Sequence, residues 1–167
     1  MEYSICRAKK SDLDALTEVE SICFPKEEAA TRESLAARLD AFENWFFVAK
    51  DGKGKIIGMI DGMATDEESI DDAMFEDASL HREDGAVQTV FGLDVLPAWR
   101  GKGVAGALMR AFVDAAKQAG RRKVTLTCKA HLIGMYGHFG FTLIGKARSV
   151  HGGAEWFDMD MQLNGAE

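Results

Sequence analysis

Apolar residues recur at helical spacing in several stretches of the chain, and these stretches are the expected helices. The first is predicted between Ser11, a candidate N-cap, and Pro25, which ends it. A second follows Thr31, another candidate N-cap, a third runs from Gly103 to Gly120, and a short one covers residues 131–139. The periodic apolar positions are Leu13, Leu16, Val19 and Ile22 in the first helix, and Val104, Leu108, Ala111, Phe112 and Ala115 in the third.

Short β-prone runs separate these helices. Residues 45–49 and 56–60 are joined by the turn Asp51-Gly-Lys-Gly54 and predict a hairpin. Residues 87–95 predict one strand long enough to cross a sheet, and the nearly uninterrupted run 123–128 is typical of a central parallel strand. Two further strands are expected at 141–145 and 156–163, with Gly152 and Gly153 in the loop between them. The pattern therefore predicts an α/β fold with a mixed sheet.

Size and composition limit the class of protein. A chain of 167 residues is expected to form a single domain, spanning residues 1–167. Three cysteines at wide spacing predict neither a disulfide framework nor a zinc site. The first seven residues have none of the apolar character of a secretory signal, and no run approaches the roughly 18 apolar residues of a membrane span. We therefore expect a cytoplasmic protein without a membrane partner.

The net charge of −7 comes mainly from one acidic segment, residues 66–84. This segment holds nine acidic residues and one basic residue, and the rest of the chain has 18 acidic and 19 basic residues. Such a local negative field disfavours nucleic acid as a partner and would attract a cationic ligand. A solvated loop kept soluble by its charge is the alternative interpretation.

The stretch from Phe91 to Gly106 carries the clearest chemical signal. An apolar strand is followed by a basic, glycine-rich turn that opens directly into a helix. Backbone N–H groups at a helix N-terminus, together with the helix dipole, bind phosphate. Glycines allow the backbone to approach the ligand closely, and Arg100 and Lys102 add positive charge. The turn therefore predicts a site for a nucleotide-like or coenzyme anion.

The glycines at 101, 103 and 106 also match the dinucleotide fingerprint G-x-G-x-x-G. That fingerprint requires the first glycine at the strand end and an acidic residue about 20 positions later, which holds the ribose. Here residues 96–100 separate the strand from the glycines, and residues 124–129 contain no carboxylate. A dinucleotide site is therefore disfavoured.

Arg100, Gly103 and Ala105 satisfy the pattern Arg/Gln-x-x-Gly-x-Gly/Ala, which resembles the acetyl-CoA signature of the GNAT superfamily of N-acetyltransferases. Residues 135–141, Met-Tyr-Gly-His-Phe-Gly-Phe, resemble the family's late tyrosine segment. The two motifs stand in the right order and cover roughly residues 87 to 145. The resemblance implies a mostly antiparallel central sheet with a parallel central strand pair and helices on both faces.

The resemblance also implies how acetyl-CoA, the expected co-substrate, is held. Backbone amides of the glycine turn would cradle the pyrophosphate, and main chain at Leu93 and Val95 would pair with the pantetheine arm. Many relatives carry an asparagine seven positions before the tyrosine, where this chain has Lys129, which would serve the phosphates or only end a strand. The expected coenzyme residues are Leu93, Asp94, Val95, Arg100, Gly101, Lys102, Gly103, Val104, Ala105, Gly106 and Lys129.

Tyr136 stands where the family's tyrosine stands and is the expected catalytic residue. Amine acetylation releases a thiolate that must gain a proton, and a phenol with a pKa near 10 can supply it. The alternative is a buried tyrosine that only packs its short helix.

Residues 21–31 and 88–95 resemble the arylalkylamine (serotonin) N-acetyltransferase branch and its microbial relatives. Vertebrate members relay protons through two histidines, which Thr89 and Phe91 replace in this chain. A water chain, Glu28 or His151 could take the proton instead, or the free amine could attack directly.

Acceptor contacts are expected from two loops, one between the first two helices and one between the last two strands. Their apolar and acidic side chains suit an aromatic or aliphatic amine, although each has a purely structural alternative. The expected acceptor residues are Phe24, Pro25, Glu27, Glu28, Phe91 and His151. No metal is expected, because His131 and His138 have no third ligand at metal spacing.

The sequence thus predicts an acetyl-CoA-dependent N-acetyltransferase that acts on a small primary amine, arylalkylamine or polyamine-like, by direct transfer in a ternary complex. A coenzyme-binding sensor without turnover and an acetyltransferase of protein lysines or N-termini are the alternatives. A homodimer is possible.

Overall fold

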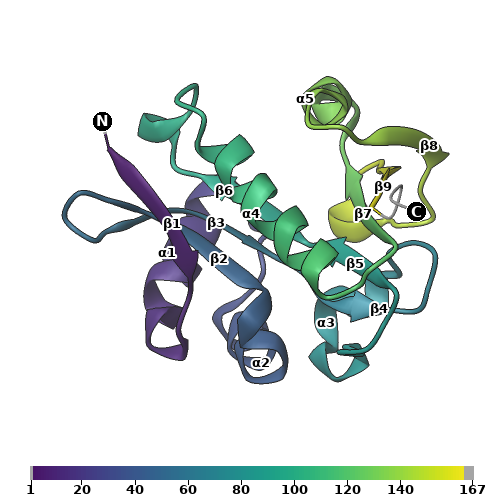
Figure 1. The fold of residues 1–167 in the computed structure, drawn as a ribbon, viewed down its shortest axis with the longest axis horizontal. Helices are drawn as coiled ribbons and strands as arrows, with labels where there is room; N and C mark the ends of the chain where they lie inside the picture. Colours follow the sequence, from purple (N-terminus) through teal and green to yellow (C-terminus); the bar gives the residue numbers. More distant parts are fainter. Residues whose placement is uncertain (1, 164–167) are drawn as a thin grey trace.

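The computed structural model describes residues 2–163, which form two sheets and their covering helices (Figure 1). The strands are β1 Tyr3–Arg7, β2 Phe46–Asp51, β3 Ile56–Asp61, β4 Ala64–Thr65, β5 Val87–Val90, β6 Gly92–Val95, β7 Lys123–Cys128, β8 Thr142–Lys146 and β9 Phe157–Gln162. The α-helices are α1 Leu13–Cys23, α2 Arg32–Phe42, α3 Asp72–Glu76, α4 Val104–Gln118 and α5 Ile133–His138.

The sheets have the strand orders β1-β2-β3-β6 and β4-β5-β7-β9-β8. Every pairing between these strands is antiparallel except that of β5 with β7, which is parallel. In Figure 1, α4 crosses in front of the strands while α1 and α2 lie on the other side. The predicted α/β fold, with its mixed, mostly antiparallel sheet and parallel central pair, is confirmed.

The prediction of one continuous strand over residues 87–95 is wrong. The stretch is interrupted at Phe91, so that β5 belongs to one sheet and β6 to the other. The segment that pairs with this stretch, from β3 to β4, changes sheets at the same level, because β3 pairs with β6 and β4 pairs with β5. Residues 62 and 63 therefore lie opposite residues 89–91, and together they form the break between the two sheets.

Buried side chains add to the two backbone hydrogen bonds that cross this break, which run from the Thr89 N–H to the Met63 carbonyl and from the Phe91 N–H to the Asp61 carbonyl. The Thr89 hydroxyl accepts from the Met63 N–H and donates to the Met63 carbonyl, each at 3.0 Å. The Gln88 side-chain amide donates to the carbonyls of Gly62 and Met63 at 3.1 Å. Gly62 is required here, since a Cβ at that position would lie 1.8 Å from the Thr89 carbonyl oxygen.

Local helix signals give mixed results. The Thr31 side chain accepts a hydrogen bond from the Ser34 N–H and caps α2, as predicted. Ser11 is not an N-cap: it lies inside a short 3-10 turn, residues 10–12, and α1 starts only at Leu13. Strand β1, which the sequence pattern did not reveal, pairs with β2 at the edge of the first sheet.

The acidic segment 66–84 folds back onto the domain. Glu68 pairs with Arg122 and Lys123, and Glu83 pairs with the buried Arg121. The Asp72 side chain accepts hydrogen bonds from Ser149 and from the Val150 N–H, which ties α3 to the loop between β8 and β9. These acids therefore hold chain segments together, which the solvated-loop interpretation did not foresee.

None of the helices within residues 2–163 is long and apolar enough to cross a membrane.

Thr89→Val should lower the free energy of unfolding by about 1–3 kcal/mol, because it leaves the buried Met63 N–H without its partner. The substitution keeps the shape of the side chain, so packing is preserved. Urea unfolding of both proteins measures the difference. Thr142→Val on the exposed face of β8 is the matched control and should change stability by less than about 0.5 kcal/mol. An unchanged midpoint for Thr89→Val would contradict this account of the break.

Candidate active site

The free edge of β6 lies at the centre of the site. Leu96 donates its N–H to Ile57, so residues 94 and 96 direct their backbone groups toward β3. The backbone groups of Leu93 and Val95 consequently face the opposite side. No strand within residues 2–163 pairs with that edge of β6, since the neighbouring β7 pairs with β5 and β9. An extended ligand can therefore add there like a strand.

A cavity of about 820 Å³ begins at this edge and runs along α4 and α5; we term it the glycine-turn cavity. Its far wall includes Met135 and Phe139. Seven residues that the sequence predicted as coenzyme contacts line it: Val95, Arg100, Gly101, Gly103, Val104, Ala105 and Gly106.

The N-terminus of α4 offers unpaired donors to this cavity. Gly103 is the N-cap, has a φ of +84°, and provides no side-chain hydrogen bond to the helix. The N–H groups of Val104, Ala105 and Gly106 precede the first intrahelical bond, which Ala107 donates to the Gly103 carbonyl. Three backbone donors and the positive end of the helix dipole therefore face a cavity that could hold an anion.

A second cavity, of about 590 Å³, lies on the other side of Leu93; we term it the acceptor cavity. It contains Tyr136 and all but one of the acceptor residues that the sequence predicted: Phe24, Glu27, Glu28, Phe91 and His151. The exception is Pro25, which is exposed and does not line the cavity. Acids outnumber bases in the lining: Glu20, Glu27, Glu28, Glu33 and Glu76 against Lys26 and Arg38.

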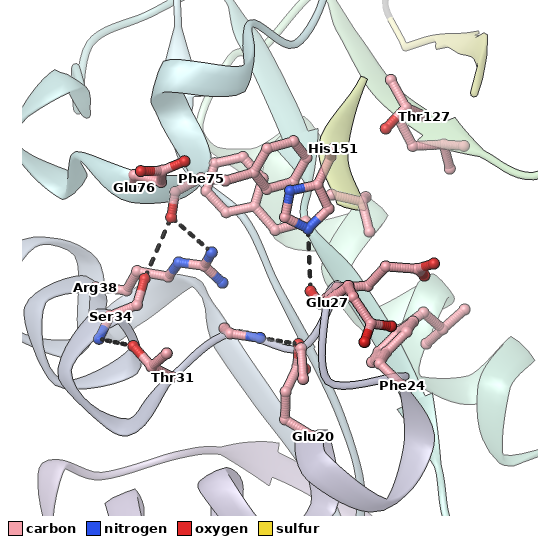
Figure 2. Close-up of a pocket in the computed structure, with 18 of the residues that line it drawn as sticks. Glu20, Phe24, Glu27, Thr31, Ser34, Arg38, Phe75, Glu76, Thr127 and His151 are labelled. Carbon is pink, nitrogen blue, oxygen red and sulfur yellow. Dashed lines mark hydrogen bonds between the residues drawn. The ribbon is translucent and has the colours of Figure 1, made fainter. Parts of the chain in front are cut away.

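One wall of the acceptor cavity is α3, held in place by α2. Ser34 and Arg38 both donate to the Phe75 carbonyl, at 3.2 and 2.9 Å (Figure 2). The His151 ring stacks on the Phe75 ring at 4.7 Å between centroids. His151 Nε2 lies 3.0 Å from the Glu28 carbonyl oxygen, which can only accept. Nε2 therefore carries the proton of the neutral ring, and Nδ1 is the basic nitrogen.

Tyr136 is buried on α5. The phenol lines the acceptor cavity, whereas its neighbour Met135 lines the glycine-turn cavity. Burial, and to a smaller extent Cys128 and Asp94, raise the pKa of Tyr136 well above its usual value. The phenol therefore stays protonated at neutral pH and can act only as a proton donor there.

Comparison with known protein families identifies the family of this chain. Residues 13–141 match the family described as Acetyltransferase (GNAT) family. The chain belongs to the GNAT acetyltransferase family. The prediction of an acetyl-CoA-dependent acetyltransferase is thereby confirmed. No curated protein matches the sequence.

Solved structures share the acetyltransferase fold at low identity. The loading GNATL domain of CurA from Lyngbya majuscula has a TM-score of 0.84 at 14% identity, over 98% of this chain and 99% of that chain. A GNAT superfamily phosphinothricin acetyltransferase from Sinorhizobium meliloti, in complex with AcCoA, has 0.73 at 20%, over 99% and 91%. The GphF GNAT-like decarboxylase in complex with isobutyryl-CoA has 0.78 at 23%, over 96% and 99%. Because a decarboxylase shares the fold, the fold alone does not specify the reaction.

Four of the predicted coenzyme contacts of this acetyltransferase do not line the glycine-turn cavity, and one of them, Leu93, lines the acceptor cavity instead. Lys102 is exposed outside it. Lys129 forms an ion pair with Glu28 and lies 5.8 Å from the Trp156 ring, on the acceptor side. The Asp94 side chain is buried on the face of β6 that α1 covers, and its pKa responds most strongly, after burial itself, to Glu20. Lys129 lies on the acceptor side because its partner Glu28 is remote in the sequence, whereas Lys102 belongs to the turn itself and is exposed to solvent.

The two positions that replace the histidine relay, and the candidate base Glu28, are engaged in other contacts. The Thr89 hydroxyl is fixed at the break, and the Glu28 carboxylate pairs with Lys129. Phe91 has no proton-accepting group and lies under the Arg38 guanidinium at 4.7 Å. Neither His131 nor His138 belongs to a metal-ligating group, and residues 2–163 contain no cluster of three or more His, Cys, Asp or Glu side chains placed to hold a metal ion.

The sequence analysis missed a group of buried acids. Glu20 on α1, Asp61 on β3 and Asp94 on β6 are 6%, 1% and 1% exposed. Asp61 forms an ion pair with Arg38 at 3.1 Å, and Glu20 accepts a hydrogen bond from the Ala30 N–H (Figure 2). The available signal was an aspartate within each of two otherwise apolar strands, residues 56–61 and 92–95, because charged residues are rarely buried without a reason.

Asp61 should make the stability of the protein depend on pH. Burial raises its pKa from 3.8 to about 6, although Arg38 opposes this shift. The folded chain then binds the proton more tightly than the unfolded chain, so stability falls as the pH rises through this range and levels off above it. Relative to Asp61→Asn, the wild type should lose about 1–3 kcal/mol between about pH 4 and pH 7.

Urea unfolding at a series of pH values measures this difference. Asp40→Asn, at an exposed acid that pairs with Lys10, is the control and should keep the wild-type pH dependence. Parallel pH profiles for the wild type and Asp61→Asn would contradict the shift.

Proposed function

We propose that this acetyltransferase transfers the acetyl group of acetyl-CoA to the primary amine of a small molecule, by direct attack in a ternary complex. The observation that carries the proposal is the pair of cavities on either side of the β6 edge. One has backbone donors at a helix N-terminus, the other is acidic and aromatic, and α5 contributes Met135 to the first and Tyr136 to the second. The proposal takes residues 1–167 as a single cytoplasmic acetyltransferase domain, and it leaves room for a homodimer.

The glycine-turn cavity would take the coenzyme. The N–H groups of residues 104–106 would bind its pyrophosphate, and Arg100 lies beside them with its Nε donated to the Val95 carbonyl at 2.9 Å. The outward backbone groups of Leu93 would pair with the pantetheine amides, as in strand addition. The thioester would then reach the boundary between the two cavities, next to Tyr136.

The acceptor cavity supports an amine with an apolar body. Its excess of carboxylates attracts a cation, and its walls include the rings of Phe24, Phe75, Phe91 and Trp156. A volume of about 590 Å³ fits a small molecule. These features, together with the segments 21–31 and 88–95, favour the arylalkylamine N-acetyltransferase-like branch, with a polyamine as the second choice.

Tyr136 would protonate the departing sulfur. The amine nitrogen attacks the thioester carbon, the carbon–sulfur bond breaks, and the phenol gives its proton to the thiolate. The raised pKa of Tyr136 keeps the phenol protonated before each turnover.

Thiol release from acetyl-CoA over a panel of amines tests the proposed function, with the acetylated product identified by mass spectrometry. Arylalkylamines and polyamines should be acetylated with saturable kinetics. Coenzyme binding without turnover on any amine would favour the sensor alternative. Turnover restricted to peptides would favour the protein acetyltransferase, a class that includes a structural neighbour, the ribosomal-protein-S18-alanine N-acetyltransferase from Escherichia coli.

Tyr136→Phe should lower kcat by about 10- to 10⁴-fold, because the thiolate loses its proton donor while the ring still packs. Steady-state kinetics with the best amine of the panel measures the loss. Coenzyme affinity, determined by calorimetry, should stay unchanged and serves as the control for folding. An unaltered kcat would remove Tyr136 from the reaction.

Gly103→Glu should weaken coenzyme binding by about 10²-fold or more, because a carboxylate would repel the pyrophosphate and a side chain would strain the backbone at a φ of +84°. Calorimetric titration with coenzyme A measures the affinity. Gly103→Gln carries the same strain without the charge and should bind better than the Glu variant. Gly52→Glu, in the hairpin turn with open space around it, should bind normally. Wild-type affinity in Gly103→Glu would place the phosphates elsewhere.

A further inference from the structure

Three carboxylates from separate elements meet below the acceptor cavity, beside Gly92. A Cβ at position 92 would lie 3.1 Å from Asp94 Oδ1, 3.6 Å from Glu20 Oε1 and 3.7 Å from Asp61 Oδ1. The three oxygens therefore surround one point. Gly92 itself lines the acceptor cavity, as do Glu20 and Leu93. The absence of a side chain at Gly92 keeps this point open toward the β6 edge.

Several of these oxygens have no hydrogen-bond partner among residues 2–163. Both oxygens of Asp94 and Oδ1 of Asp61 are enclosed and unpaired. Within a protein interior such orphaned acceptors are costly, and most buried polar atoms are satisfied. They indicate a group or a proton that the site is built to receive.

The charge of the cluster leads to the same conclusion. Arg38 is bound to Asp61 at 3.1 Å, which leaves Glu20 and Asp94 without a paired base. Two adjacent buried carboxylates cannot both remain ionised, so one proton is shared between them. Burial, and then Glu20, raise the pKa of Asp94 well above its ordinary value, which places the resting proton on Asp94.

Glu20 is the member of the cluster that reaches the substrate. It lines the acceptor cavity, and Figure 2 shows its side chain at the base of that cavity, below Arg38. Its Oε2 accepts from the Ala30 N–H at 2.9 Å, which holds the carboxylate and leaves Oε1 on the side of Gly92.

We infer that Glu20 takes the proton from the ammonium group of the acceptor, with protonated Asp94 behind it as a positioning residue. The inference rests on the proposed function and deepens it, because it names the group that prepares the amine. It also defines the acceptor as a compound that arrives as a cation.

The protons balance over one turnover. The ammonium gives one proton to Glu20, which passes it to solvent, and the neutral nitrogen then attacks the thioester carbon. When the carbon–sulfur bond breaks, Tyr136 protonates the sulfur. The second proton, from the newly bonded nitrogen, restores the phenol. One proton is released for each amide formed.

Groups from every packed element act on this carboxylate pair. Asp61 on β3 adds negative charge and Arg38 on α2 offsets it, while Cys23 on α1 and Tyr136 on α5 are neutral neighbours. Burial raises the pKa of Cys23, so its thiol adds no charge, and Arg100 lies beside it. The Glu20–Asp94 pair therefore has one acidic and two neutral neighbours, and the cation of the cluster is engaged with Asp61.

Two amines of matched shape separate this role from a structural one. The first is a phenethylamine, which is protonated at neutral pH, and the second is a side-chain-fluorinated analogue that is largely neutral there. Glu20→Gln keeps an acceptor for the Ala30 N–H. It should lower kcat/KM about 10²-fold for the cationic amine and by no more than a few-fold for the neutral one. Coenzyme affinity should remain that of the wild type.

Glu18→Gln is the matched control, since Glu18 lies on the exposed side of the same helix. It should leave both rates unchanged. Asp94→Asn tests the positioning residue in a separate variant, so its result does not depend on whether Glu20→Gln folds. An amide is neutral, like the protonated carboxyl, and can still donate to Glu20, so Asp94→Asn should keep kcat/KM for the cationic amine within a few-fold of the wild type, whereas Asp94→Leu should lower it about 10-fold.

Equal losses for the two amines in Glu20→Gln, or no loss for either, would overturn the inference and leave the proposed function intact. A loss in Asp94→Asn as large as that in Asp94→Leu would likewise overturn the positioning role of Asp94. Failure of the wild type to acetylate any amine would overturn both the proposed function and the inference.

Discussion

The break at residues 61–63 and 89–91 is the constraint on which the site depends. Because both crossing segments change sheets at the same level, β6 is left as a free edge beside β7. A continuous strand would have paired along its whole length and closed the space into which an extended ligand fits. The hydrogen bonds of Thr89 and Gln88 stabilise the break, since they satisfy the Met63 N–H and the Gly62 carbonyl, which the ladder no longer pairs. The polar side chains of β5 therefore help to shape the site, although they line neither cavity.

The two cavities differ in electrostatic character although both are lined by residues of β6 and α5. Backbone donors and Arg100 define the first, and carboxylates define the second. A negatively charged coenzyme and a positively charged amine would each be attracted to one side and repelled from the other. Such a division would place the coenzyme and the amine in separate cavities without the movement of any loop or helix.

Local signals predicted much of the fold and part of the site. Thr31 as a helix cap, the glycine turn before α4 and the alternation of apolar positions depend on neighbours in the sequence, and they appear as expected. Features that depend on distant residues were missed or misplaced. The strand break depends on Met63 meeting Thr89, the position of Lys129 depends on Glu28, and the acid cluster unites positions 20, 61 and 94. An apolar strand pattern cannot reveal which buried aspartates face each other.

The glycine N-cap of α4 links the folding of this protein to its ligand. A helix that starts without a side-chain cap is incompletely stabilised, and an anion bound to residues 104–106 would supply the missing partner. By mass action, such a ligand at 100 times its Kd adds about 2.7 kcal/mol to the folded state. Its concentration in the surroundings would then set how often this helix frays, and hence how long a protein molecule survives proteolysis.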